Sequence, residues 1–386
     1  MSSSAPFGRG KTAIVGAATF GMGEAPGFTS KDLAAHASIV ALAQANLQPG
    51  DVDALFVCLS DDMLSGMTLA EYLGIRPKLT DNNRTGGSSF LIHVMLAALA
   101  LESRQCDVVL IAYGSNQRTA TGKLANLIRT SVYEAPYRAL SPISAYALAA
   151  ARHMHQYGTT REQLGAVAIA ARKWAQLNPE AFARAELTMQ DYLQARMVSD
   201  PLGVRDCCLV TDGAAAIVVT RADRAKDHAS SPAFVLGAAC ATWHQEISNA
   251  QDLTVTAAVE SGARAYAQAG VKPADIDTVQ LYDAFTINTL LFLEDLGFCP
   301  KGEGGRFVEN GRIAPGGELA VNTNGGGLSC VHPGMYGLFT LVEATQQIMR
   351  VAGARQVPDV QLALCHGNGG VLSSQATVIL GTRSCL

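Results

Sequence analysis

The sequence repeats itself, and this internal duplication constrains the fold more than any other feature of the chain. Residues 43–55 and 267–279 share an Ala-Gln-Ala start, a proline and two aspartates at equivalent positions. Three further pairs of segments match in the same order along the chain: 14–18 with 235–239, 82–89 with 322–329, and 111–114 with 364–367. Chance explains one such match but not four in register, so we infer two copies of one structural unit.

Each copy has the pattern of an α/β unit. Residues 108–112 and 376–380 are almost continuously apolar, which is typical of strands that are buried on both faces. Residues 91–101 and 338–351 have the periodicity of helices that pack along one side. We therefore expect strands and helices to alternate in each copy, with a glycine-rich turn before one of the helices.

The two copies differ in length. We expect an α/β fold whose halves span residues 1–225 and 226–386. An insert at about residues 118–206 lengthens the first half before its closing strand. Within this insert, residues 145–157 and 160–176 predict helices.

Composition narrows the classes of function. Only 16% of the 386 residues are charged, against about 25% in an average protein, so we expect a homodimer that buries surface between subunits. The balance of 29 Lys and Arg against 33 Asp and Glu, without a basic run, argues against nucleic-acid binding. No apolar run approaches the roughly 20 residues that cross a bilayer. Nine cysteines without C-x-x-C spacing favour reduced thiols in a cytoplasmic protein and predict no metal site.

Four motifs carry a resemblance to a known family. Asp206–Ala216 reads DCCLVTDGAAA, Gly325–Ser329 precedes His332-Pro333, and Gly367–Gly370 reads GNGG. Tyr282–Phe285 reads YDAF, where the family carries His-Asp-Cys-Phe. Together they resemble the thiolase superfamily, specifically the sterol-carrier-protein-x type, which includes thiolase-like lipid-transfer proteins and thiolase-fold retro-aldolases. The resemblance covers nearly the whole chain. It implies the thiolase fold and coenzyme A as part of the substrate, with no permanently bound cofactor.

The sequence departs from thiolases at the cysteines. The resemblance places an acylated cysteine just after the turn at residues 82–87, but no cysteine lies between Cys58 and Cys106. The second cysteine of the family, an acid/base, is Ala284 here, and the histidine of the same motif is Tyr282. Two such losses in a well-kept scaffold argue against acyl transfer through a covalent intermediate.

The resemblance also implies where the chemistry takes place. The catalytic centre is expected where the glycine-rich turns of both halves meet, outside the carboxyl ends of the strands. We expect the amides of Gly325, Gly326 and Gly327, together with Gly367, to bind the CoA thioester there. His332 is the expected side-chain donor to the thioester oxygen.

Tyr282 is the most informative substitution. It follows a predicted strand at residues 278–281, and its hydroxyl acts as acid or base if its pKa falls from about 10. Such a group suits removal of the proton from a β-hydroxyl, after which the Cα–Cβ bond breaks. The products are a ketone or aldehyde and an acyl-CoA enolate. This retro-aldol reaction requires an oxyanion hole but no covalent nucleophile.

Other interpretations stay open. Tyr282 can be a core residue, His332 a turn residue, and the glycines can serve positive φ or close packing alone. His366 stands where many thiolases carry a cysteine, and Cys330 is a candidate for a displaced nucleophile. We favour cysteine-independent retro-aldol cleavage of a β-hydroxyacyl-CoA. The alternatives are a thiolase-type acyltransferase that uses Cys330 or another thiol, and a non-catalytic subunit that binds acyl-CoA or lipid. The resemblance to retro-aldolases adds a small zinc-ribbon/OB-fold accessory subunit as a partner.

Overall fold

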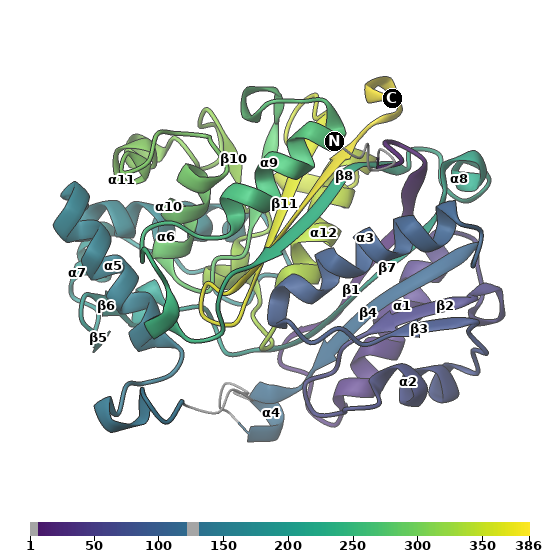
Figure 1. The fold of residues 1–386 in the computed structure, drawn as a ribbon, viewed down its shortest axis with the longest axis horizontal. Helices are drawn as coiled ribbons and strands as arrows, with labels where there is room; N and C mark the ends of the chain where they lie inside the picture. The colour runs from purple at the N-terminus through teal and green to yellow at the C-terminus, as the bar shows by residue number, and fades with distance from the viewer. Residues whose placement is uncertain (1–6, 122–130) are drawn as a thin grey trace.

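A large mixed sheet covered by helices forms the architecture, seen in a computed structural model that describes residues 7–121 and 131–386 (Figure 1). Within these residues, ten strands form the sheet in the order β10-β9-β11-β12-β8-β1-β7-β4-β2-β3. Their bounds are β1 Thr12–Gly23, β2 Ala54–Val57, β3 Leu79–Asp81, β4 Val108–Ser115, β7 Asp212–Arg221, β8 Ala233–Thr242, β9 Thr278–Leu281, β10 Ala320–Val321, β11 Leu362–Gly369 and β12 Ser374–Gly381. A separate small sheet pairs β5 (Met197–Ser199) with β6 (Leu202–Gly203).

The order of the strands confirms the internal duplication. Outward from the centre, β1-β7-β4-β2-β3 of the first half mirrors β8-β12-β11-β9-β10 of the second half. The matched segments of sequence lie on equivalent strands, since residues 111–114 belong to β4 and residues 364–367 to β11. At the centre, β1 pairs antiparallel with β8, and Thr12 lies opposite Val235. The prediction of an α/β fold with two similar halves is therefore confirmed.

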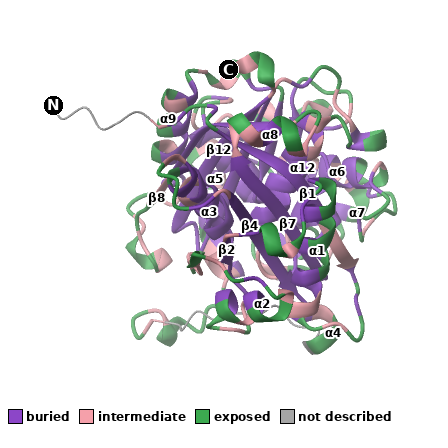
Figure 2. Cartoon of the chain, turned by 90° about the vertical axis from the view of Figure 1, so that its right-hand side faces the viewer, coloured by how far each residue is buried: buried purple, intermediate pink, exposed green. Residues whose placement is uncertain are grey.

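Two helices fill the space between the halves. α3 (Ser89–Glu102) and α12 (Gly337–Met349) contact each other and strands of both halves. They are the helices that the periodicity predicted at 91–101 and 338–351. β4, β11 and β12 are buried at every position, as their apolar runs predicted. Figure 2 shows this buried interior in purple, with exposed residues on the surrounding helices and loops.

The remaining helices lie around this core. α1 (Ser30–Gln44) packs on β1, β4 and β7, and α9 (Ala258–Ala269) packs on β8 and β12. The others are α2 (Ser65–Leu73), α4 (Gln117–Thr121), α7 (Met189–Leu193), α8 (Ala222–His228), α10 (Thr286–Asp295) and α11 (Gly304–Phe307). In the described part of the chain, no helix combines the length and the hydropathy needed to span a membrane.

The insert of the first half packs against the second half. Its helices α5 (Ile143–Tyr157) and α6 (Arg161–Gln176) confirm the two predicted helical segments, whereas residues 122–130 lie outside the described residues. The Trp174 indole on α6 donates to the carbonyl oxygen of Ile313 at 3.0 Å. His153 on α5 lies 2.9 Å from a carboxylate oxygen of Glu294 on α10. The boundary between the halves at residue 225 falls within α8 and stays a prediction.

Candidate active site

The glycine-rich turns of the two halves are in direct contact. A Cβ atom on Gly369 would overlap the carbonyl oxygen of Thr85, and a Cβ atom on Gly87 would overlap the ring of Tyr282. Because any larger side chain would push the two turns apart, glycine is required at these close approaches. The structure thus brings together the turns that the sequence analysis expected to meet.

Tyr282 and His332 form a hydrogen-bonded pair beside the contact between the two glycine-rich turns. Tyr282 directly follows β9, and its hydroxyl oxygen lies 3.1 Å from His332 Nε2. The ring of Tyr336 lies edge-on to Tyr282 with the ring centroids 5.8 Å apart, and it stacks on His332 at 6.4 Å. All three side chains are buried. The two residues that the sequence analysis singled out for proton transfer and oxyanion binding therefore lie within reach of each other.

Burial determines the protonation of this pair. It lowers the pKa of His332 to about 4, so the imidazole is neutral at pH 7. It raises the pKa of Tyr282 well above the ordinary value, because the phenolate would be desolvated. The condition that the sequence analysis set for acid/base action, a lowered phenol pKa, is therefore not met in the resting site. Tyr282 is a neutral phenol in the resting site and requires a partner that accepts its proton.

His332 has one ring nitrogen to offer to a ligand. A neutral imidazole that accepts a hydrogen bond from the phenol at Nε2 carries its own proton at Nδ1. This Nδ1 is buried and has no hydrogen-bond partner among the described residues. A buried donor without a partner costs about 1–3 kcal/mol, a cost that a ligand oxygen removes. His332 Nδ1 is therefore the side-chain donor available to a bound thioester.

The first half holds the turn that begins at His332. The His332 N–H donates to Thr211 Oγ1 at 2.9 Å, and Gln117 Nε2 donates to the His332 carbonyl oxygen at 2.8 Å. The Tyr113 hydroxyl donates to the carbonyl oxygen of residue 333 and accepts the N–H of Met335 at 3.2 Å. Sequence reasoning missed these supports, because residues from 121 to 222 positions away in the chain provide them.

The glycine loop uses its amides internally. The N–H of Gly325 donates to the carbonyl of residue 322 at 2.8 Å, and that of Gly326 donates to Asn324 Oδ1 at 2.8 Å. The N–H of Gly327 donates to Asp283 Oδ1 at 2.6 Å, and burial raises the pKa of Asp283 to about 7. All three amides are thus satisfied within the protein, and the expectation that they donate to a thioester oxygen stays a prediction. The loop fixes the segment that leads to His332.

His366 and Gly367 lie inside β11. His366 Nδ1 is 3.0 Å from Thr377 Oγ1 and its Nε2 is 2.9 Å from Gln375 Oε1, so both ring nitrogens are bonded to β12. Both ring nitrogens are therefore occupied within the second half, and the catalytic role expected for His366 stays a prediction. Its carbonyl oxygen accepts the Tyr282 N–H at 3.0 Å. A Cβ atom on Gly367 would press on Leu91 of α3 at 2.7 Å, so this glycine permits close packing, and its ligand role stays a prediction.

Cys330 is not poised as a nucleophile. It is fully buried, with its Sγ 3.5 Å from Asn178 Nδ2, and burial raises its pKa well above the ordinary value. A nucleophilic cysteine needs a lowered pKa, usually from a neighbouring base or cation. Burial also raises the pKa of Cys58 to about 11 and that of Cys207 to about 12. The burial of Cys330 and its raised pKa argue against the displaced-nucleophile interpretation, which stays a prediction.

Tyr146 is a further residue beside the site that no local sequence pattern revealed. It reaches in from α5 of the insert, donates to the Gly370 carbonyl at 3.0 Å and accepts from Asn368 Nδ2 at 2.9 Å. Its ring lies 4.4 Å from that of Phe285, measured between centroids. Across residues 7–121 and 131–386, no group of three or more His, Cys, Asp or Glu side chains is placed to hold a metal ion.

Known proteins resemble this chain over nearly its full length. A family model described as "Thiolase C-terminal domain-like" matches residues 239–382. The chain is 32% identical to the acetyl-CoA acetyltransferase of Methanothermobacter thermautotrophicus, over 95% of this chain and 98% of the relative. It is 34% identical to the 17-hydroxy-3-oxo-4-pregnene-20-carboxyl-CoA lyase of Mycobacterium tuberculosis, again over 95% and 98%. The solved structure of the Ltp2-ChsH2(DUF35) aldolase matches with a TM-score of 0.87 at 32% identity, covering 97% of this chain and 98% of that chain.

Proposed function

The chain belongs to the thiolase superfamily, in its sterol-carrier-protein-x-like branch, and we propose that it is a retro-aldolase that cleaves the Cα–Cβ bond of a β-hydroxyacyl-CoA. One observation carries this proposal. The Tyr282–His332 pair lies where the turns of both halves meet, and it is accompanied by no family cysteine. Acyl transfer by a thiolase needs a covalent nucleophile, whereas aldol cleavage needs proton transfer and an oxyanion donor.

The first step moves two protons along the pair. The β-hydroxyl proton of the substrate passes to the Tyr282 oxygen while the phenol proton passes to His332 Nε2. The 3.1 Å contact between the two residues is the path for the second transfer. Such a relay lets a phenol with a raised pKa accept a proton, because its oxygen never carries a full negative charge. The β-oxygen then becomes the carbonyl oxygen of the ketone or aldehyde product as the Cα–Cβ bond breaks.

The second step stabilises and then protonates an enolate. The electron pair of the broken bond passes to Cα and on to the thioester oxygen, which accepts a hydrogen bond from His332 Nδ1. After the relay His332 is an imidazolium, and its positive charge faces the negative enolate in a buried site. Return of the proton to Cα gives the shortened acyl-CoA and restores the neutral pair. Coenzyme A enters and leaves as part of substrate and product.

A thiolase-type acyltransferase is the second candidate, because the acetyltransferase relative is matched over 98% of its length. That chemistry requires the acyl group to reside on an enzyme nucleophile for part of the cycle. The positions that the family resemblance assigns to the two cysteines hold Arg84-Thr85-Gly86 and Ala284. Cys330 does not replace them, since burial raises its pKa. The lyase is therefore the better-supported reaction.

The name of the lyase relative indicates a class of substrate. It describes a steroid carboxyl-CoA with a hydroxyl at carbon 17, which is the carbon β to the thioester carbonyl. We include in the proposal a β-hydroxyacyl-CoA whose β-carbon carries two carbon substituents and therefore yields a ketone.

Two partners complete the proposal. A homodimer is favoured by Met63, Leu64 and Met67, whose side chains at the start of α2 are 80%, 61% and 65% exposed. α2 contacts β3, one of the two edge strands of the sheet, and an edge strand can pair with a second copy about a two-fold axis. An accessory subunit is supported by the solved aldolase, whose name joins Ltp2 with ChsH2(DUF35).

The nine free cysteines fit a reducing compartment such as the cytoplasm.

Substrate choice tests this function. The purified protein, with and without a co-expressed accessory subunit, is given a β-hydroxyacyl-CoA and the β-ketoacyl-CoA of the same chain length. We expect cleavage of the hydroxy compound alone, and in D₂O the product acyl-CoA gains one deuterium at the former Cα. Cleavage of only the keto compound, with consumption of free CoA, would establish the acyltransferase instead.

A further inference from the structure

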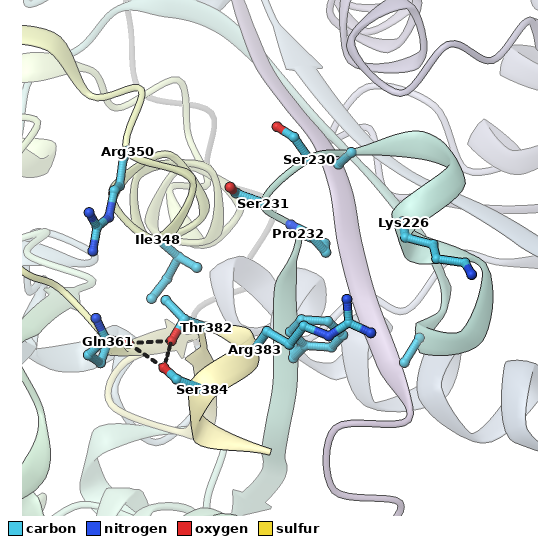
Figure 3. Close-up of a pocket in the computed structure, with 13 residues that line it drawn as sticks. Lys226, Ser230, Ser231, Pro232, Ile348, Arg350, Gln361, Thr382, Arg383 and Ser384 are labelled. Atoms are coloured by element: carbon cyan, nitrogen blue, oxygen red, sulfur yellow. Dashed lines mark hydrogen bonds between the residues drawn. The ribbon is translucent and has the colours of Figure 1, made fainter.

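A pocket lined by three cationic side chains lies at the junction of α8, β8, α12 and the C-terminal segment (Figure 3). Its volume is about 450 Å³. Lys226 comes from α8, Arg350 directly follows α12, and Arg383 follows β12. None of the thirteen lining residues is acidic.

The cations of this pocket are not neutralised by the protein. Lys226, Arg350 and Arg383 form no salt bridge among the described residues. Other surface arginines do find partners, such as Arg306 with Glu303 at 3.1 Å and Arg312 with Glu318 at 3.0 Å. Several unpaired charges of one sign around one cavity create a potential that attracts counter-ions. The electrostatics of the pocket therefore favour an anion.

Hydrogen-bond donors and an apolar wall complete the pocket. The hydroxyls of Thr382 and Ser384 both donate to Gln361 Oε1, at 2.5 and 2.6 Å, which fixes this side chain and leaves its NH₂ group as a donor. Ser230 and Ser231 add two hydroxyls to the lining, and five apolar residues form the rest of the wall. That apolar wall consists of Ala222, Ala229, Pro232, Phe234 and Ile348. The lining thus combines positive charge with a surface for a nonpolar group.

We propose that this pocket binds a phosphate-bearing small molecule of about the size of a nucleoside diphosphate. Guanidinium and ammonium groups are the side chains best suited to phosphate oxygens, and hydroxyls add donors. The pocket volume lies within the roughly 300–1,000 Å³ of small-molecule sites. Phosphate alone would leave the apolar wall uncovered, whereas a nucleoside covers it.

This site is distinct from the Tyr282 site. Gln361 immediately precedes β11 and Thr382 immediately follows β12, which is antiparallel to β11. The glycine turn against Tyr282 and Gly87 lies at the other end of the same two strands. At about 3.3 Å per residue, the length of β11 separates the two sites by roughly 23 Å. The pocket is therefore independent of the proposed reaction, and its ligand ties α8, which links the halves, to α12 and the C-terminal segment.

Calorimetric titration of the full-length protein with ADP and with pyrophosphate tests the site. We expect ADP to bind, to raise the melting temperature and to lose affinity with added salt. The double variant Lys226→Gln/Arg383→Gln should bind ADP at least about tenfold more weakly. Arg306→Gln, which removes a surface cation outside the pocket, is the matched control and should bind as the parent does.

The other arms separate the sources of binding. The double variant Lys226→Gln/Arg383→Gln should cleave the β-hydroxyacyl-CoA at the parent rate, which shows that the pocket is not the reaction site. Pyrophosphate should bind about tenfold more weakly than ADP, because it does not cover the apolar wall. Equal affinities for the two compounds would contradict the nucleoside part of the proposal. Parental ADP affinity in the double variant, or no ADP binding by the parent protein, would overturn it altogether.

Discussion

Cys58 and Tyr282 occupy equivalent positions in the two halves, yet they have different surroundings. Each residue directly follows a short buried strand, β2 or β9. Cys58 is a buried thiol whose pKa is raised to about 11, with desolvation as the main cause. Tyr282 instead bonds His332 and packs against the glycine turn of the first half. The duplication therefore supplies two similar frames, of which only the second carries the proposed chemistry.

A second pair of equivalent positions shows what the first half contributes. Tyr113 on β4 corresponds to His366 on β11 in the matched segments. The His366 ring stays within its own half, bonded to two residues of β12. Tyr113 reaches into the second half and holds the backbone that follows His332. The first half thus acts as a support for the turn that presents His332.

The largest expected effect separates Tyr282 from Cys58. Tyr282→Phe deletes one hydroxyl and keeps the ring, so the fold should be retained while turnover of a β-hydroxyacyl-CoA falls about 10²–10⁴-fold. Cys58→Ala alters the equivalent position of the first half and should keep turnover within about threefold. Steady-state rates with separate measurement of acyl-CoA affinity check both. Parental turnover in Tyr282→Phe would return this residue to a packing role.

His332→Gln should rank second. Glutamine keeps a polar side chain in the turn before Pro333 but removes the imidazole that takes the phenol proton and donates from Nδ1. We expect kcat to fall about 10²–10³-fold with little change in acyl-CoA affinity. A raised KM with unchanged kcat would show that His332 contributes only to ground-state binding.

The pH dependence of the unfolding free energy tests the buried neutral state of His366. Burial lowers the pKa of His332 and of His366 to about 4, below the ordinary value of about 6.5. Between these values the unfolded chain binds a proton at each histidine and the folded protein does not, so stability is complete above pH 6.5 and is lost as the pH falls toward 4. Each histidine accounts for about 3 kcal/mol of this loss. Urea unfolding at pH 7 and pH 4.5 measures it, and His366→Gln should remove roughly half of the contribution of the two residues. An unchanged pH dependence in that variant would contradict the buried neutral state of His366.

Tyr113→Phe should have a smaller effect on the rate. It removes the hydroxyl that bridges two backbone groups of the His332 turn and keeps the packing of the ring. A less well-positioned imidazole should lower kcat about tenfold at unchanged KM, since Tyr113 acts through the turn. The pH profile of kcat should shift as well, because the environment of His332 changes. A change confined to melting temperature would mean that Tyr113 serves stability alone.

The smallest effect should come from thiols. Cys330→Ser removes the best remaining candidate for a nucleophile, and its raised pKa indicates that it does not act as one. We expect turnover within about twofold of the parent, with at most a modest loss of stability from the buried hydroxyl. Loss of all turnover in this variant alone would restore the acyltransferase interpretation.

The repeat and its motifs made the fold predictable, because matched segments must fold alike and the apolar runs place them inside a sheet. They also brought Tyr282 and His332 to one place, since both lie in motifs at strand ends. The pKa of Tyr282 was not predictable, because burial depends on packing that spacing does not reveal. The same limit explains His366, whose partners Thr377 and Gln375 are ordinary strand residues in the sequence.

The residues that hold the site in place could not be predicted from the sequence for a similar reason. Tyr113 and Tyr146 lie in a buried strand and in the insert, and neither belongs to a motif that marks a site. Their hydroxyls reach residues more than 200 positions away. The internal amide bonds of Gly325–Gly327 likewise depend on where Asp283 and Asn324 point. Long-range hydrogen bonds of this kind become visible only in three dimensions.

The central claim, cleavage without a covalent thiol, is tested most directly by the dependence of the rate on free CoA. The accessible thiols of the enzyme are alkylated, and the β-hydroxyacyl-CoA is added at free CoA concentrations from zero to 1 mM, roughly the upper end of common KM values. The retro-aldol account expects the same initial rate throughout, with acyl-CoA and carbonyl product formed one to one. A rate that is zero without free CoA and rises as CoA is added, or that disappears on alkylation, would contradict it.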